Sequence, residues 1–509
     1  MKQSDRVNPR FMVFLFSFQK LFLFKFHFLR CAPRLLSKLF PPVMKFESFQ
    51  SVQRKLVLLG AHWHNDTDIE ALSQKTRGTG QFIASVNGGS YETGLYELLR
   101  LPFSPTSRST AYDLSERINY CFLLFIGQDK KLTNEERILI QEMANYVMGN
   151  LEYYGRRWTN NHYLNNARAL LSASILLKDR QLASRALRIL KHALNINFPN
   201  GIFQERSSSY QCLIGYWLKS IYLYLDLIEG TVALKQTVLN LLAKNEIRGL
   251  QVLNFGDNTP DFSKVNIQCL TAFFDQFLPT RELNAESEWI SCLNSGNFEF
   301  SIVTGEHERF GPEHGYRNLA CFHLTFKGRP IFLSTARPSY NKATVMLGND
   351  PVSLSSGHIL VDGKSIYGQK ADLPMLNYCT DPKKLPFVSE ISKDRQSSNF
   401  SLLINSMHGV IKEIFYFYAD EFFIELFHQD GKVITLSFLI PEEFSFTNGY
   451  LDSENLKLSV ITSENLVNLK NETCSYSDEY GVSKKGWRLI ALFGPTNPGE
   501  ASFIKFKEK

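Results

Sequence analysis

The chain has 509 residues, of which 44% are hydrophobic and 21% are charged, so it is large enough to bury the cores of two domains. Aromatic residues make up 13%, and the sequence shows no Gly-X-Y or polar repeat, which excludes collagen-like and wholly disordered classes. Within the net charge of +6, residues 1–43 carry eight Lys or Arg against one Asp, which gives +7 there and −1 for the remainder. A basic field for nucleic acid is therefore absent, and any anion must be recognised by a local cluster.

Residues 1–50 are expected to form a separate basic and aromatic segment. Residues 11–30 are rich in Phe, but Lys20, Lys25 and His27 interrupt the apolar run, which argues against a membrane-spanning helix and against a signal peptide. Two interpretations stay open for residues 11–38: peripheral contact with an anionic membrane, or packing on the domain that follows. Together with eight scattered cysteines, this favours a cytoplasmic or membrane-peripheral protein over a periplasmic one. The sequence leaves the oligomeric state open.

The region 51–290 is predicted to be a helical domain. Apolar residues recur at helical spacing from about 132 to 244, and the residues that define these stripes include Ile138, Ile140, Met143 and Val147. Thr133 and Glu136 have the spacing of a capping box, and Asn200-Gly201 separates one helix from the next. We therefore expect amphipathic helices that stack as hairpins.

The region 291–509 is predicted to be an antiparallel β-sandwich. From Phe298 onward the apolar period changes to two, in segments such as FEFSIVTG, HILVDGK, FSLLINS and WRLIALFG. Asp362-Gly363, Lys327-Gly328 and Asp430-Gly431 are short turn signals between these segments. The predicted join between the two domains lies between about Leu250 and Asn297.

Three polar segments are the candidates for chemistry. In RRWTNNHYLNNARALL, Arg157, Asn161 and His162 lie at a predicted helix start, whose N–H groups and dipole favour a carboxylate or sulfate. The alternative is an Asn cap with an ordinary surface histidine. FQERSSSYQ contains Glu205, Arg206 and Tyr210, and RFGPEHGYRN is a Gly/Pro loop before a strand. The alternative for FQERSSSYQ is a capping segment with a half-buried tyrosine.

The three segments, in this order, resemble the heparinase II/III-like polysaccharide lyases. NNHYLNNARALL is similar to the Asn-His helix of that family, ERSSSYQ to its Glu-Arg-Ser-Pro-x-Tyr-His segment, and HGYRNLACFHLTF to its stretch that begins His-x-His-x-Asp. HILVDGK is similar to its Val-Asp-Gly hairpin. The resemblance covers roughly residues 90–370 and depends on the order of the motifs. It implies an α/α toroid, an incomplete barrel of helical hairpins, followed by an antiparallel β-sandwich.

The resemblance also implies residue roles in the β-elimination of an acidic polysaccharide or oligosaccharide that contains uronate. Removal of the C5 proton requires neutralisation of the adjacent carboxylate, a role that falls to Asn161 and His162. Tyr210 would be the phenol that transfers the proton, with His314 as its partner on the sandwich side. The residues expected to bind or orient substrate are Arg108, Arg157, Glu205, Arg206, Tyr316 and Arg317.

Departures from the family pattern bear on the metal and on the reaction. Tyr316, Ser334 and Ser356 occupy positions where many relatives carry zinc ligands, so we expect no metal and no other cofactor. Gln211 replaces a usual histidine, and His358 alone does not make a site. Two alternatives to a lyase stay open: a uronate C5-epimerase on the same scaffold, and a non-catalytic protein of surface-polysaccharide binding or assembly.

Overall fold

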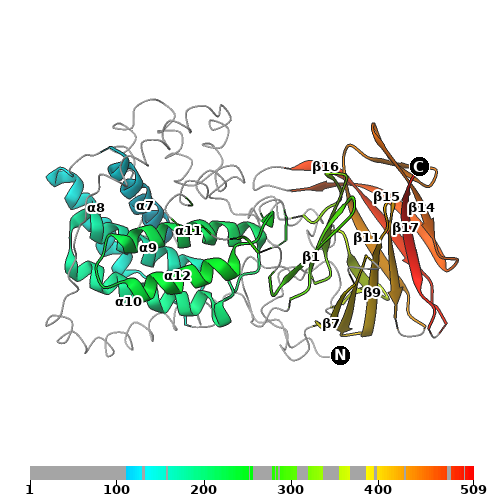
Figure 1. Cartoon of the computed structure of the whole chain (residues 1–509), viewed down its shortest axis with the longest axis horizontal. Coiled ribbons are helices and arrows are strands. Elements are labelled where there is room, and N and C mark those ends of the chain that lie inside the picture. The colour runs from blue at the N-terminus through cyan, green and yellow to red at the C-terminus, as the bar shows by residue number, and fades with distance from the viewer. Residues whose placement is uncertain are drawn as a thin grey trace, which may run out of the picture. The chain divides into compact units, whose positions relative to one another are not determined.

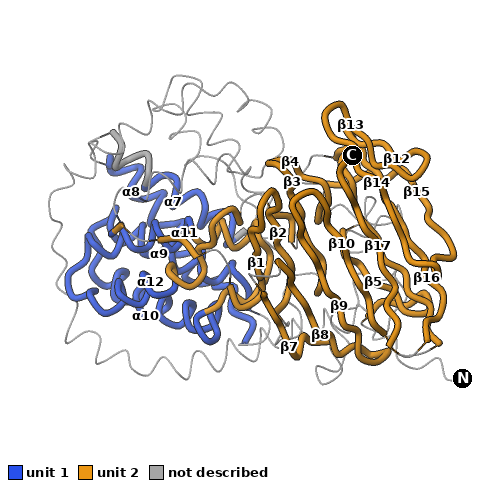
Figure 2. The backbone as a smooth tube through the Cα atoms, turned by 45° about the vertical axis from the view of Figure 1, so that its right-hand side comes forward, with its two compact units in different colours: residues 1–201, 216–241, 272–279 blue, residues 202–215, 242–271, 280–509 orange. Residues whose placement is uncertain are grey.

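Helices occupy the earlier part of the described chain and strands the later part (Figure 1). The computed structural model describes residues 110–128, 132–155, 159–250, 253–255, 275, 278–280, 282–284, 287–305, 319–335, 355–366, 386–394, 398–428, 431–477, 483–497 and 499–509. The chain divides into two compact units, shown in two colours in Figure 2. The first comprises residues 1–201, 216–241 and 272–279, and the second comprises residues 202–215, 242–271 and 280–509. The N-terminal segment and its predicted membrane contact lie outside the described residues.

The predicted helices are present, and their start and stop signals act as expected. Glu136 N donates to Thr133 Oγ1 over 3.2 Å and Thr133 N donates to Glu136 Oε2 over 2.7 Å, which confirms the capping box. Asn200 and Gly201 have φ angles of 57° and 85°, a conformation that interrupts a helix. The elements are α7 (Thr110–Gln128), α8 (Asn134–Gly149), α9 (Asn161–Leu177), α10 (Arg180–Asn197), the 3-10 turn η2 (Pro199–Gly201), α11 (Ser208–Asp226) and α12 (Val232–Asn245).

Helix α9 is the central helix of the first unit. It packs against α7, α8 and α10, and almost every one of its residues is buried. A helix that is buried on all sides must pair its polar side chains inside the protein, and α9 carries several of them. Ile138 departs from the prediction, because it is 59% exposed on α8 while Ile140, Met143 and Val147 form the buried face. None of the helices in the described residues is long and apolar enough to cross a membrane.

The second unit contains three antiparallel sheets, which confirms the predicted β-rich C-terminal region. The four-stranded sheet has the order β1 (Ile290–Ser295), β2 (Phe298–Val303), β3 (Phe322–Phe326), β4 (Arg329–Phe332). The five-stranded sheet has the order β15 (Leu466–Tyr476), β16 (Lys484–Phe493), β11 (Ile434–Pro441), β5 (His358–Val361), β6 (Lys364–Ser365). The eight-stranded sheet has the order β12 (Ser445–Thr447), β13 (Tyr450–Ser453), β14 (Leu456–Thr462), β17 (Ser502–Glu508), β10 (Glu421–Phe427), β9 (Gly409–Phe417), β8 (Asn399–Ser406), β7 (Phe387–Asp394).

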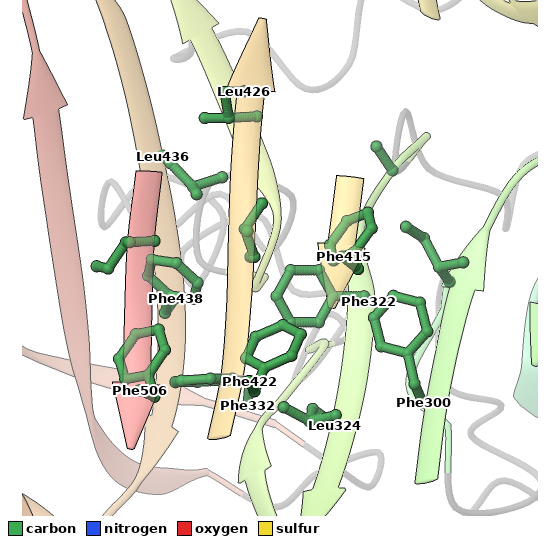
Figure 3. Packing of buried hydrophobic residues seen from close by; sticks show 14 of the residues in the cluster. Phe300, Phe322, Leu324, Phe332, Phe415, Phe422, Leu426, Leu436, Phe438 and Phe506 are labelled. Carbon is green, nitrogen blue, oxygen red and sulfur yellow. The ribbon is translucent and has the colours of Figure 1, made fainter. Parts of the chain in front are cut away.

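One hydrophobic core joins side chains from all three sheets. Phenylalanine rings dominate it (Figure 3): the ring centroids of Phe332 and Phe506 lie 4.7 Å apart, and those of Phe300 and Phe415 lie 4.9 Å apart. Aromatic pairs at such distances add stabilisation beyond the area that they bury. Along β9 and β10, buried residues alternate with more exposed ones. This alternation is the reason that an apolar period of two predicted these strands.

Several strands were not among the predicted segments. They are β1, which lies in the predicted join, together with β7, β12, β13 and β15. Strand β15 pairs with β16 along its length, but most of its residues are exposed or only half-buried. Its pairing with β16, the next strand along the chain, supplies its hydrogen bonds, and its mostly exposed residues carry no hydrophobic alternation that predicts it.

Candidate functional site

The first group of candidate residues lies at the start of α9, in the first unit. Asn160 is the N-cap of this helix, and its side-chain oxygen accepts a hydrogen bond from His162 N over 3.1 Å. Asn161 is buried, while the side chain of His162 is 28% exposed. The sequence left a cap and an anion-binding helix start as alternatives. The structure shows the cap, with Asn161 and His162 next to it in the first turn of α9.

A carboxylate that the sequence analysis missed holds the His162 ring. Glu152, which is buried, places Oε1 3.0 Å from Nδ1 of His162. Asn166, one helical turn after His162, donates from Nδ2 to Glu152 Oε2 over 3.2 Å and accepts from Glu152 N over 2.9 Å. Asn166 Nδ2 also donates to Ser115 Oγ of α7 over 3.1 Å. The spacing of four residues between His162 and Asn166 is a signal in the sequence, whereas Glu152 lies in a non-helical segment and has none.

Aromatic packing fixes the plane of the His162 ring. The centroid of the Tyr112 ring, on α7, lies 4.4 Å from that of the His162 ring, with 39° between the planes. Tyr112 in turn lies 6.3 Å from the Trp217 ring of α11. His162 is thus held by a carboxylate at Nδ1 and by a buried phenol ring, which limits the rotations of its side chain.

Beneath this site, α7 and α9 share a buried polar network. Arg168 Nη2 donates to Glu116 Oε1 over 2.6 Å, and Arg168 Nε donates to Asn165 Oδ1 over 3.2 Å. The guanidinium group lies 4.7 Å from the centroid of the Trp217 ring. Burial by itself lowers the pKa of Arg168, but Glu116 and the surrounding tyrosines raise it by more, so Arg168 stays charged. A buried charge needs such partners, and loss of either Arg168 or Glu116 would leave the other charge unpaired in the interior.

The second group of candidates belongs to the second unit, at the start of α11. Tyr210 is buried, and its backbone N–H donates to Ser207 Oγ over 3.2 Å. Glu205 is fully buried, and Arg206 has a φ angle of +43°, which is strained for a residue with a side chain. Strain of this kind persists where the surrounding structure holds the segment firmly.

Side-chain hydrogen bonds anchor this segment. Gln211, which the sequence resemblance aligns with a histidine, donates to the carbonyl oxygen of Asn245 and accepts from Trp289 Nε1 over 2.9 Å. Ser208 Oγ bonds to the carbonyl oxygen of Leu253. Gln211 therefore has a structural role that fixes the first turn of α11, the turn that carries Tyr210.

The remaining predicted site residues are not described. Arg108, Arg157, His314, Tyr316 and Arg317 lie outside the described residues. Asn161 and His162 are brought together in the first unit, whereas Glu205, Arg206 and Tyr210 lie in the second. The convergence of Tyr210 and His314 with His162 therefore stays a prediction.

Ser334 and Ser356, which the sequence resemblance aligns with zinc ligands of relatives, lie in the second unit. Ser356 Oγ accepts from Leu439 N over 2.9 Å, which is a structural bond between neighbouring segments, and Ser334 is buried. His358 faces the interior, where burial lowers its pKa to about 3, with Arg488 as a further cause. Across the described ranges, no group of three His, Cys, Asp or Glu side chains is arranged to hold a metal ion.

Comparison with known proteins gives a match in fold but not in sequence. No family model matches the chain, and no curated protein matches it. Among solved structures, it is similar to a heparinase III with a TM-score of 0.54, at 11% identity over 84% of this chain and 75% of the other. This chain has the fold of the heparinase III lyases.

Two further structures support that assignment. A second structure described as heparinase III matches with a TM-score of 0.53, at 12% identity over 92% of this chain and 86% of the other. The heparan sulfate lyase HepC from Pedobacter heparinus matches with a TM-score of 0.50, at 13% identity over 88% of this chain and 78% of the other. At these identities the similarity to heparinase III and HepC establishes the architecture, a helical region followed by antiparallel sheets. The chemistry depends on the residues of the site and not on the architecture.

Proposed function

We propose that this protein is a polysaccharide lyase that cleaves uronate-containing polymers by β-elimination. The observation that carries the proposal is the first turn of α9, which carries Asn161 and a His162 ring held by Glu152, in a heparinase III fold. A donor ring held in one orientation by buried partners is what recognition of a sugar carboxylate requires.

The first task of such a lyase is to acidify the C5 proton of the uronate. As that proton leaves, negative charge spreads onto the carboxylate, and hydrogen-bond donors placed there stabilise the enolate more than the ground state. Asn161 and His162 are the proposed donors. Of the basic residues that we expect to bind substrate, Arg206 follows the buried Glu205 directly and precedes the turn that carries Tyr210.

The second task is proton transfer, which we assign to Tyr210. The phenolate oxygen takes the C5 proton, the electron pair of the C–H bond forms the C4–C5 double bond, and the C4–O bond breaks. The leaving glycosidic oxygen then receives a proton from the tyrosine, which restores the phenolate. The hydrogen bonds of Ser207 and Gln211 support this assignment, since they hold the turn that presents Tyr210.

The test is incubation of the purified full chain with heparan sulfate, chondroitin sulfate, hyaluronan and alginate. A lyase produces an unsaturated uronate that absorbs in the ultraviolet, and His162→Gln strongly lowers the rate at which that signal appears. Exchange of solvent deuterium into the polymer without ultraviolet absorbance would show a C5-epimerase instead. Binding with neither signal would show a non-catalytic protein. The matched control is Tyr418→Phe on the exposed surface of the sandwich, which leaves the rate unchanged.

A further inference from the structure

Glu152 is a buried carboxylate with no part in the proposed chemistry. It lies in the segment between α8 and α9, and its two oxygens have different partners: Oε1 meets His162 Nδ1 at 3.0 Å and Oε2 accepts from Asn166 Nδ2 at 3.2 Å. Burying a carboxylate is unfavourable unless its oxygens are hydrogen-bonded. An acid at this position therefore calls for an explanation, and both of its bonds point to the His162 ring and to its supporting turn.

The direction of the two hydrogen bonds between Glu152 and Asn166 can be assigned. The backbone N–H of Glu152 is a donor only, so the Asn166 atom that it meets at 2.9 Å is the amide oxygen, and Asn166 Nδ2 donates to Oε2. With Oε2 accepting from Asn166, a carboxylate that also accepts at Oε1 requires the proton of the contact with His162 to lie on Nδ1.

We infer that Glu152 is a positioning residue that holds His162 with Nδ1–H directed into the protein, so that Nε2 is the ring nitrogen that meets the uronate. The identity of the substrate rests on the proposed function. The geometry rests on the contacts of Glu152 with His162 and Asn166. In a histidine, the bond made by one nitrogen decides the protonation and orientation of the other. Tyr112, whose ring lies 4.4 Å from that of His162, holds the plane of the imidazole.

The spectroscopic test needs no substrate. In protein labelled with ¹⁵N histidine, long-range ¹H–¹⁵N correlation shows which ring nitrogens carry protons, and His162→Gln assigns the signal. Wild type is expected to show a protonated Nδ1, and Glu152→Ala is expected to lose that preference. A wild-type Nδ1 without a proton, or an unchanged pattern in Glu152→Ala, overturns the inference. Since this readout needs no turnover, it stands even where every polymer fails as a substrate.

The kinetic test is a double-mutant cycle between Glu152 and His162. Glu152→Gln is expected to lower kcat roughly 10- to 100-fold with little change in KM, the range found when groups that orient metal-bound histidines are removed. In a His162→Gln background, Glu152→Gln should have no further effect, because Glu152 acts only through the ring. Losses that multiply would contradict the inference. The matched control is Glu142→Gln, an exposed acid on α8, which leaves kcat unchanged.

Discussion

Glu413 offers the sharpest test of the energetics of the β-rich unit. On β9 it faces the core between Ile411 and Phe415, and the residues opposite it are Leu402 on β8 and Leu426 on β10. The side chain is fully buried, and neither carboxylate oxygen has a hydrogen-bond partner among the described residues. Burial raises its pKa from 4.5 to about 8. The folded protein therefore holds this proton at neutral pH, and the unfolded chain releases it.

The magnitude follows from linkage. Between pH 4.5 and about 8 the folded state binds one proton more than the unfolded state at this group, so the free energy of unfolding falls as pH rises. The slope is about 1.4 kcal/mol per pH unit, which sums to about 5 kcal/mol over the interval. Above about pH 8 the contribution stays constant. Glu413→Gln has nearly the same shape and no titrating group, so it removes this slope.

The assay is urea unfolding of wild type and Glu413→Gln at several values between about pH 5 and 9. Subtracting the two curves cancels the other titrating groups, since both proteins share them. Glu413→Gln should gain stability relative to wild type as pH rises. Glu442→Gln, an exposed acid of the same unit, should show a constant difference from wild type. A constant difference for Glu413→Gln as well would refute the claim that its carboxyl is desolvated.

Three further outcomes are expected. Tyr210→Phe should lower the rate of uronate elimination by at least about 100-fold while binding is kept, which stopped assays and isothermal titration with the same polymer can check. Arg168→Met should reduce the free energy of unfolding by about 3–5 kcal/mol, because it leaves Glu116 buried without its cation. The double variant with Glu116→Leu should recover part of that loss, and urea titrations measure both changes. Burial lowers the pKa of His358 from 6.5 to about 3, so this histidine is neutral in the folded protein. Its contribution to stability is complete above pH 6.5 and is lost as pH falls toward 3. His358→Gln should therefore weaken the loss of thermal stability between pH 6.5 and 3, which thermal melts can measure.

Local elements were predictable where one residue pattern decides one conformation. The capping box of Thr133 and Glu136 depends only on residues three apart, and Asp362-Gly363, with φ angles of 49° and 72°, forms the turn between β5 and β6. Ile138 shows the limit of helical periodicity as a signal of burial, because an apolar residue at helical spacing is buried only if another element covers it. Strand β15 shows the converse, since pairing with β16 makes a strand of a segment with little apolar alternation.

The candidate site also contains features that local sequence predicts and features that it does not. Asn161 and His162 are neighbours at a helix start, so their proximity could be predicted from the sequence. Glu152 could not, because its bond to His162 depends on how the chain between α8 and α9 returns to the first turn of α9. The same is true of Gln211, whose two partners are 34 and 78 residues away in the chain.

The sequence by itself determined the order of helices and strands and the residue types available for chemistry, because helical and strand periodicity record which face of each element is apolar. Tertiary structure decided which polar groups meet and which lose water. Glu413 stands at an inward position of its strand in the sequence, yet only the packing of the sheets around it removes its solvent and raises its pKa. Burial and pairing of polar groups arise from contacts between distant segments, and no local pattern encodes them.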